Sequence, residues 1–292
     1  MTRVALLVGG IAIGFAAIFF RLAAPTDPLL ASALRLSVAG LFLSPVSLRA
    51  VARGTLTPRA LRVAVLGGVL YAVHFGAWVA SLERTTVAAS VTLVTCTPLV
   101  LAGIAVLRGR DRPRTQTMLA SVAAAIGALV IGAGDASEAG WGALSGDLLA
   151  ALGALAMALY LLAVRELGKV PAFAFSGIAA LTGAAVLTLG VMGRAFFFET
   201  PTPPDEQAFF FIVLAALVPQ LVGHGALTWA LERATPTEVG LATAIEPVVS
   251  TLLAWVVLDE TPTPIVRVGA ALTLAAVVIG VGPSFGDREI AR

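Results

Sequence analysis

Long apolar stretches separated by short polar segments dominate this chain. A helix needs about 20 apolar residues to cross the hydrocarbon core of a bilayer. Runs of this length recur along the sequence, and they lack the strict alternation that is typical of a membrane β-strand. The pattern therefore predicts an all-α integral membrane protein with ten transmembrane helices, at 4–21, 28–48, 61–82, 86–107, 115–134, 147–165, 171–193, 208–231, 236–258 and 265–283.

The composition agrees with this interpretation. Hydrophobic residues make up 59% of the 292 residues and charged residues 12%, whereas soluble domains contain about 25% charged residues. The run from Arg3 to Phe20 has the charge and the apolar centre of a secretory signal peptide. We expect it to remain as a permanent helix, because it is long for a signal peptide and takes part in the repeat described below.

Basic residues are distributed unevenly between the two sides of the predicted spans. If the N-terminus lies in the cytoplasm, fourteen of the 19 basic residues fall on the cytoplasmic side. Arg21, Arg84, Arg194 and Arg267 fall on the opposite side, and Arg35 lies inside a span. Because cytoplasmic loops collect Lys and Arg, this distribution predicts that both termini are cytoplasmic. It also explains the basic charge of the chain without a nucleic-acid partner.

Two segments half a chain apart have similar sequences. "SLERTTVAASVTLVTCTPLV" at 81–100 and "ALERATPTEVGLATAIEPVV" at 230–249 align without gaps at a shift of 149 residues. Each half of the chain would hold five spans, an odd number, so the halves must be inverted in the membrane. We therefore predict two inverted repeats of five helices, 1–142 and 143–292, around a central cavity. This architecture is typical of secondary transporters, and the alternative is a duplication that only builds a stable bundle.

These segments resemble the drug/metabolite transporter superfamily, in particular its EamA-like members. The resemblance rests on the "LER…P" and "LER…EPVV…LDE" patterns, the five-plus-five layout and the short basic loops. In that family the fourth and ninth spans contain a proline and often end in a glutamate. The ninth span here ends "VVLDE" at 256–260, whereas the fourth ends "AVLRGR" at 105–110 and departs from the pattern. The resemblance implies an inner-membrane transporter of metabolites, amino acids or drugs, and no particular substrate.

A glutamate and a proline interrupt the ninth apolar run side by side. A carboxylate inside a span is costly to insert and normally faces a cavity or a partner. Pro247 removes a helix hydrogen bond, which is tolerated where the freed carbonyl meets protein or water. We predict that Glu246 is the proton-coupling residue and that Pro98 and Pro247 kink their helices around the cavity. The alternative is that Glu246 only holds helices together. At the position equivalent to Glu246 the first half has Thr97.

The second span contains Arg35, which we predict to be a substrate-binding residue. A guanidinium group binds carboxylates well, so Arg35 can bind an acidic group of a substrate. Two alternatives remain open, a pair with Glu246 and a structural ion pair near the outer interface. An arginine at this position of the second span also resembles the EamA-like pattern.

Further candidate substrate-binding residues lie in the third and eighth spans. Tyr71, His74 and Trp78 are spaced by three and four residues, so they share one helix face that can stack on an amphipathic substrate. Gln220 and His224 form a similar pair four residues apart. Each histidine can relay protons because histidine titrates near neutral pH. The alternative for all five side chains is packing between helices.

These features favour a secondary active transporter over other classes of protein. We expect alternating access and proton-coupled export of small amphipathic metabolites such as amino acids, with multidrug efflux as the alternative. The sequence contains no HExxH or GxxxxGK[ST] motif, so we expect no enzyme, no catalytic residue and no bound metal or cofactor. The expected partners are a small-molecule substrate, protons and the lipid bilayer, and the expected state is a monomer or a weak homodimer. The "GIAIG" pattern at 10–14 is interpreted as packing within one chain.

Overall fold

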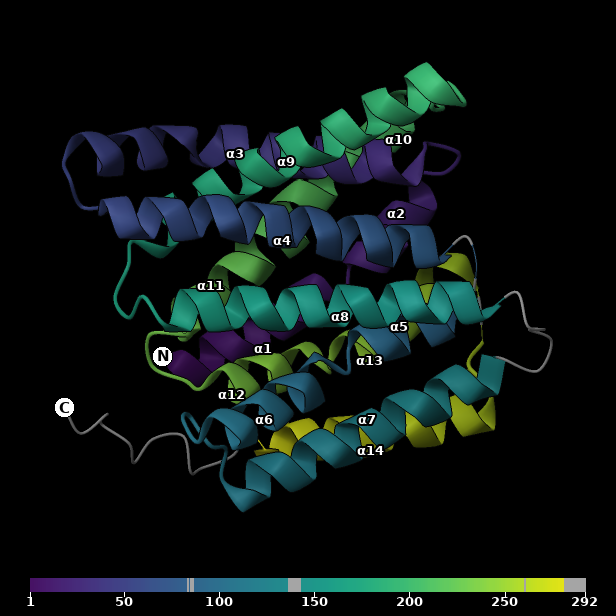
Figure 1. The fold of residues 1–292 in the computed structure, drawn as a ribbon. Coiled ribbons are helices and arrows are strands. Elements are labelled where there is room, and N and C mark those ends of the chain that lie inside the picture. Colours follow the sequence, from purple (N-terminus) through teal and green to yellow (C-terminus); the bar gives the residue numbers. More distant parts are fainter. Residues whose placement is uncertain (83, 85–86, 136–142, 260, 281–292) are drawn as a thin grey trace.

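A computed structural model of the 292-residue chain describes all residues except 83, 85–86, 136–142, 260 and 281–292. Two glutamates of the motifs quoted above, Glu83 and Glu260, and the end of the last predicted span lie outside the described residues. The described residues form helices and no strands (Figure 1). The α-helices and one π-helix (η1) are α1 (Thr2–Ile13), α2 (Ala16–Leu22), α3 (Pro28–Ala52), α4 (Pro58–Leu82), α5 (Val87–Val94), α6 (Thr97–Arg108), α7 (Thr115–Asp135), α8 (Ala143–Arg165), α9 (Ala172–Phe197), α10 (Glu206–Ala215), η1 (Ala216–His224), α11 (Gly225–Ala230), α12 (Pro236–Thr243), α13 (Glu246–Leu258) and α14 (Pro264–Gly280).

Seven of the predicted spans are long and apolar enough to cross a membrane. They run over Thr2–Leu22, Pro28–Ala52, Pro58–Ser81, Leu144–Arg165, Ala172–Phe197, Glu206–Ala230 and Pro236–Leu258. Shorter apolar helices occupy the other three predicted segments, at Thr97–Arg108, Thr115–Val130 and Pro264–Gly280. Many large apolar side chains, such as those of Phe42, Leu107 and Leu189, point outward and are exposed. Apolar surface on this scale is what a lipid bilayer covers.

Four of the predicted spans are interrupted in their middle. The first span breaks between α1 and α2, the fourth between α5 and α6, and the ninth between α12 and α13. Pro98 and Pro247 each lie at the second position of the helix that follows a break. In the eighth span, Pro219 lies inside the π-helix η1. Proline lacks an N–H and clashes with the preceding turn, so a widened turn accommodates it.

The helices pair across the two halves of the chain. α3 packs against α9, and α7 packs against α14 (Figure 1). α4 contacts α8, α6 contacts α12, and α1 contacts η1 and α11. Each of these pairs takes one member from the first half of the sequence and one from the second.

Glycines allow the closest of these contacts. A Cβ on Gly40 would lie 2.7 Å from Leu181 in α9, and one on Gly127 would lie 2.8 Å from the carbonyl oxygen of Gly269 in α14. In α1, a Cβ on Gly10 would meet Ile245 at 2.6 Å. The prediction that the "GIAIG" pattern packs within one chain is therefore confirmed for Gly10.

Candidate functional site

A small chamber lies where the interrupted spans meet. Its volume is about 40 Å³, enough for a few water molecules and too small for a metabolite. Residues from both halves of the chain surround it, and several of them flank the breaks in the first, fourth and ninth spans or end the π-helix of the eighth. The lining residues are Ile13, Ala16, Arg35, His74, Phe75, Trp78, Val94, Thr95, Thr97, Met157, His224, Thr243 and Glu246.

Arg35 is the most buried charged residue of this lining, with 1% of its surface exposed. Its Nη2 donates to Oε1 of Gln220 at 2.9 Å. The guanidinium also stacks over the ring of Phe75, 4.4 Å from the centroid, and lies 5.7 Å from the ring of Phe20. Its Nε and Nη1 are buried and have no hydrogen-bond partner in the described part of the chain. Arg35 therefore retains donors that a ligand can use.

Glu246 lies at the first position of α13 and faces the same chamber. Within the described residues its carboxylate accepts no hydrogen bond and joins no ion pair, including one with Arg35. A helix N-terminus stabilises a carboxylate through its unpaired N–H groups and its dipole. Thr97 occupies the equivalent place at the start of α6, and its hydroxyl donates to the carbonyls of Val94 at 2.9 Å and Ala154 at 3.4 Å.

The two predicted histidines lie in different surroundings along the chamber. Nδ1 of His74 is 2.9 Å from the carbonyl oxygen of Gly153. Since only a protonated nitrogen can donate to a carbonyl, this contact leaves Nε2 of a neutral His74 as an acceptor. The ring of His224 meets the rings of Tyr71 and Phe75 edge-on, at centroid distances of 5.7 and 5.8 Å.

The structure brings five of the predicted site residues to the chamber and places two behind them. Arg35, His74, Trp78, His224 and Glu246 line it. Gln220 lies outside the lining and holds Arg35. Tyr71 lies behind the lining as well, fully buried and stacked on Tyr160 at 4.2 Å.

Sequence reasoning missed two aromatic residues that contact Arg35. Phe75 follows His74 and shares the helix face of Tyr71 and Trp78, so the spacing rule that selected those residues also includes it. Phe20 lies in α2 and packs edge-on against Trp78 at 5.9 Å. No local pattern marks Phe20, because it reaches the site only through the packing of α2.

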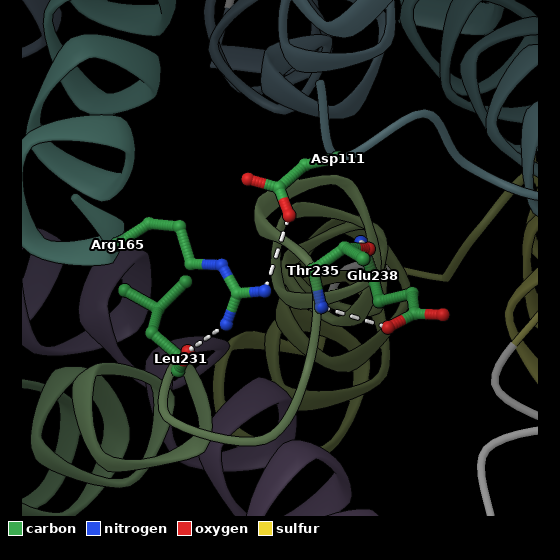
Figure 2. Close-up of polar contacts among 5 residues, drawn as sticks. All are labelled: Asp111, Arg165, Leu231, Thr235 and Glu238. Atoms are coloured by element: carbon green, nitrogen blue, oxygen red, sulfur yellow. Dashed lines mark hydrogen bonds and ion pairs between the residues drawn. The ribbon is translucent and has the colours of Figure 1, made fainter. Parts of the chain in front are cut away.

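A larger vestibule lies at the end of the molecule where α6, α8 and α12 meet. Its volume is about 790 Å³. The charged residues of its lining are Arg108, Arg110, Asp111, Arg165, Glu166, Lys169 and Glu232. Figure 2 shows that Arg165 joins both halves of the chain: its Nη2 donates to Asp111 at 3.1 Å and its Nη1 to the carbonyl of Leu231 at 3.0 Å. Beside it, Thr235 and Glu238 form a capping box that fixes the start of α12.

Tight packing separates the vestibule from the chamber. Thr97, Leu101 and Ala105 follow one another at intervals of four residues on one face of α6, from the chamber to the vestibule. Leu101 is almost completely buried. A Cβ on Gly240 of α12 would lie 2.8 Å from Leu101 and 3.3 Å from Pro98. The close approach of α6 and α12 thus closes the chamber on this side.

A third cavity, a pocket of about 230 Å³, lies next to α2. Phe20 and Val79 form part of its wall. Since Phe20 also contacts Trp78 and Arg35, its ring stands between this pocket and the chamber. The described residues include no group of three or more His, Cys, Asp or Glu that could hold a metal ion.

The fold and the site together define a helical membrane protein with charged side chains around a small internal chamber. The sequence model of the EamA-like transporter family matches residues 2–133 and 144–281. The chain therefore belongs to the EamA-like transporter family, within the drug/metabolite transporter superfamily, as the sequence resemblance implied. It is a multi-pass membrane protein and a transporter of small molecules. Solved structures share this fold, among them a crystal structure of a protein with a TM-score of 0.78, 19% sequence identity and 96% of each chain covered.

Proposed function

We propose that this chain is a secondary active transporter that exports small amphipathic metabolites, amino acids or related compounds, in exchange for protons. The observation that carries this proposal is the chamber, because a buried arginine and a glutamate line it together with aromatic side chains and residues that flank the helix breaks. Charged residues inside a membrane are retained where they serve a substrate or ion pathway. Interrupted helices likewise form the binding sites of many transporters.

The proposed architecture is a pair of inverted repeats, 1–142 and 143–292. Two observations support it. The breaks in the fourth and ninth spans coincide at the shift of 149 residues that relates their sequences, since α6 begins at Thr97 and α13 at Glu246. The helix pairs α3–α9, α6–α12 and α7–α14 each combine equivalent spans of the two halves. In this arrangement both termini face the cytoplasm, and the vestibule opens on the cytoplasmic side of the inner membrane.

The small volume of the chamber supports the proposal of alternating access. A metabolite does not fit into about 40 Å³, so the chamber must enlarge for transport. We propose that separation of α6 from α12 at Leu101 and Gly240 joins it to the vestibule, and that displacement of Phe20 opens it toward the opposite side. Rocking of the third, fourth, eighth and ninth spans exchanges the two states, and the protein works as a monomer or a weak homodimer.

Proton coupling is assigned to Glu246. The other titratable or charged side chains that line the chamber are Arg35, His74 and His224, and Tyr71 contacts His224 from behind. A carboxyl that exchanges its proton with each side in turn couples the proton gradient to the movement of substrate. The histidines stay open as proton relays.

Multidrug efflux is the second candidate function. Ile13, Ala16, Phe75, Val94 and Met157 give the chamber an apolar wall, and apolar walls accept lipophilic compounds. Under the multidrug-efflux hypothesis, Arg35 and Glu246 have a structural role. It predicts that transported compounds share size and lipophilicity and no charge pattern.

Counterflow in proteoliposomes tests both candidates. Proteoliposomes that contain the purified protein are loaded with a mixture of unlabelled amino acids or of lipophilic drugs. Uptake of the labelled compounds is then measured with and without a pH gradient. For the proposed function, amino-acid counterflow persists in Glu246→Gln, whereas gradient-driven accumulation falls at least tenfold. Glu199→Gln, an exposed change of the same kind, should leave both unchanged. Gradient-driven accumulation that survives in Glu246→Gln would remove proton coupling from this residue.

A further inference from the structure

The pocket next to α2 has room for a small molecule. Its volume of about 230 Å³ equals that of about eight water molecules in the liquid, at about 30 Å³ each. Alanines form much of its lining and leave this space because their side chains are short. They are Ala17, Ala23, Ala24 and Ala31. With Phe20 and Val79 they make the wall of the pocket mainly apolar.

One buried hydroxyl in this lining has no partner. Oγ1 of Thr26 is buried without a hydrogen bond inside the described part of the chain, and the residue as a whole is 7% exposed. The backbone around it is held in place, since the N–H of Thr26 donates to the carbonyl of Ala23 at 3.1 Å and the N–H of Asp27 to the carbonyl of Thr202 at 3.0 Å. Buried polar side-chain atoms normally have a partner. The Thr26 hydroxyl is therefore suited to a hydrogen-bonding group of a ligand.

The charges of the lining favour a neutral ligand. Arg21 is the one ionisable side chain among the described residues that line the pocket. A cation would therefore find no acidic side chain there, and a buried charge without a counterion is costly. An anion could pair with Arg21, but this residue is exposed, where ion pairs contribute little. A neutral hydrogen-bonding group at Thr26 suits the pocket better than either charge.

We propose that the pocket next to α2 binds small neutral alcohols. The hydroxyl of the ligand bonds to Oγ1 of Thr26, and its apolar body lies among the alanines, Phe20 and Val79. A threonine hydroxyl both donates and accepts a hydrogen bond, as the hydroxyl of an alcohol does. The site is separate from the chamber, because the ring of Phe20 stands between them.

A bound alcohol also confines Phe20. The ring of Phe20 packs edge-on against Trp78 at 5.9 Å and lies 5.7 Å from the guanidinium of Arg35. With a ligand on its other side, the ring has no free space to move into. This consequence rests on the proposed function, in which displacement of Phe20 opens the chamber. We therefore expect small alcohols to inhibit transport without competing with the substrate.

Photolabelling of the purified protein tests the binding site without any need for transport. The probe is octan-1-ol that carries a diazirine group, and mass spectrometry identifies the labelled residues. We expect labels within residues 17–31 or at Val79. Unlabelled octan-1-ol should compete about fivefold more effectively than octane or octanoate, because only the alcohol is both neutral and able to bond to Thr26. Labels only at other residues, or equal or better competition by octane or octanoate, would overturn the proposal.

Thr26→Val keeps the shape of the side chain and removes the hydroxyl. It should weaken competition by octan-1-ol about fivefold and leave competition by octane unchanged. Thr200→Val, an exposed change of the same kind, should alter neither. All proteins are compared in one detergent, so partitioning of the compounds into micelles cancels. An unchanged preference for the alcohol in Thr26→Val would contradict the assignment of this hydroxyl.

Ala17→Leu fills part of the pocket and should reduce labelling there about tenfold, since a well-packed site accepts no further atoms. Ala52→Leu, at an exposed position of α3, should keep the labelling of the wild type. Thermal midpoints without the probe verify that each variant is folded. Labelling of folded Ala17→Leu at the wild-type level would show that the alcohol binds elsewhere. If Ala17→Leu does not fold, Thr26→Val decides.

Counterflow in proteoliposomes separates the binding site from its effect on transport. Octan-1-ol should lower the maximal rate of counterflow in the wild type, and Thr26→Val should require about fivefold more of it. If the pocket is labelled as expected while counterflow is not inhibited, the confinement of Phe20 is refuted and the binding site stands. If counterflow is absent from the wild type itself, the proposed function fails, and the labelling still decides the binding site.

Discussion

Pro98 and Pro247 lie in equivalent places, each just after a helix break. The two sites differ in how the carbonyl group that the proline leaves free is hydrogen-bonded. In the first half, the carbonyl of Val94 is freed by Pro98 and accepts the hydroxyl of Thr97. In the second half, Pro247 frees the carbonyl of Thr243, and no side chain of the described residues donates to it. Glu246 stands where Thr97 stands. Thr97 also binds the carbonyl of Ala154 in α8, whereas the Glu246 carboxylate faces the chamber.

This difference separates a fixed helix break from one that can respond to a ligand. A hydroxyl donates whatever the pH, so the break at Pro98 is closed by its own residue. A carboxyl donates only when it carries a proton. The hydrogen bonding of the second break therefore changes whenever Glu246 gains or loses a proton, as the proposed coupling requires.

The largest expected effect comes from making the two breaks alike with Thr97→Glu. This change places a second carboxylate in the chamber and removes the bonds to Val94 and Ala154. Insertion of a charge at the centre of a span costs about 2.5–3.5 kcal/mol, so counterflow should fall at least tenfold and the thermal midpoint in detergent should drop. The exchanged variant, Thr97→Glu with Glu246→Thr, restores one carboxylate and should recover most of the thermal stability. If Thr97→Glu alone shows the counterflow of the wild type, a carboxylate at the first break does not impair transport, and the difference between the two breaks has no functional effect.

A smaller loss of stability and transport is expected at the contact between Gly240 in α12 and the start of α6, which follows the break in the fourth span. Gly240→Ala places a Cβ at 2.8 Å from Leu101 and 3.3 Å from Pro98. Overpacking of this kind costs about 1–3 kcal/mol, so the thermal midpoint should decrease and counterflow should fall a few-fold. Gly103→Ala in α6 is the control, because its Cβ would meet nothing within 4 Å. Equal thermal midpoints of Gly240→Ala and Gly103→Ala would mean that α6 and α12 can move apart at this contact without loss of stability.

The smallest effect isolates a single hydroxyl. Thr97→Val keeps the shape of the side chain and removes the donor to Val94. An unmade hydrogen bond should reduce the free energy of unfolding by about 1 kcal/mol. Thr97→Ser keeps the hydroxyl and should retain most of that stability, as judged by unfolding in denaturant. A Thr97→Val protein as stable as Thr97→Ser would indicate that water replaces the hydroxyl.

The positions of the helices could be predicted from the sequence because lipid imposes a simple length rule. Helices lie in each predicted segment, although α9 runs to Phe197, four residues beyond the predicted end. The breaks before Pro98 and Pro247 coincide with residues that sequence reasoning had selected. The break between α1 and α2 has no proline. There a Cβ on Gly14 would collide with the side chain of Val249, so tertiary packing accompanies this break and no local pattern reveals it.

The candidate site could be predicted only in part. Charge inside an apolar span marks Arg35 and Glu246 without any structure. Gln220 and His224 were selected together by their four-residue interval, but only His224 lies in the lining, and Gln220 holds Arg35. Phe20, Thr95 and Met157 are ordinary residues of apolar or hydroxylated runs. Their place beside the chamber depends on how distant helices pack.

The glycine contacts of the helix pairs α3–α9 and α7–α14 have a mechanical consequence. At Gly40 and Gly127 the backbones approach so closely that one helix cannot slide along the other without a collision. Each pair is therefore expected to move as one rigid body during the proposed transport cycle. In the proposed cycle the relative motion is then expected among the third, fourth, eighth and ninth spans, three of which are interrupted beside the chamber.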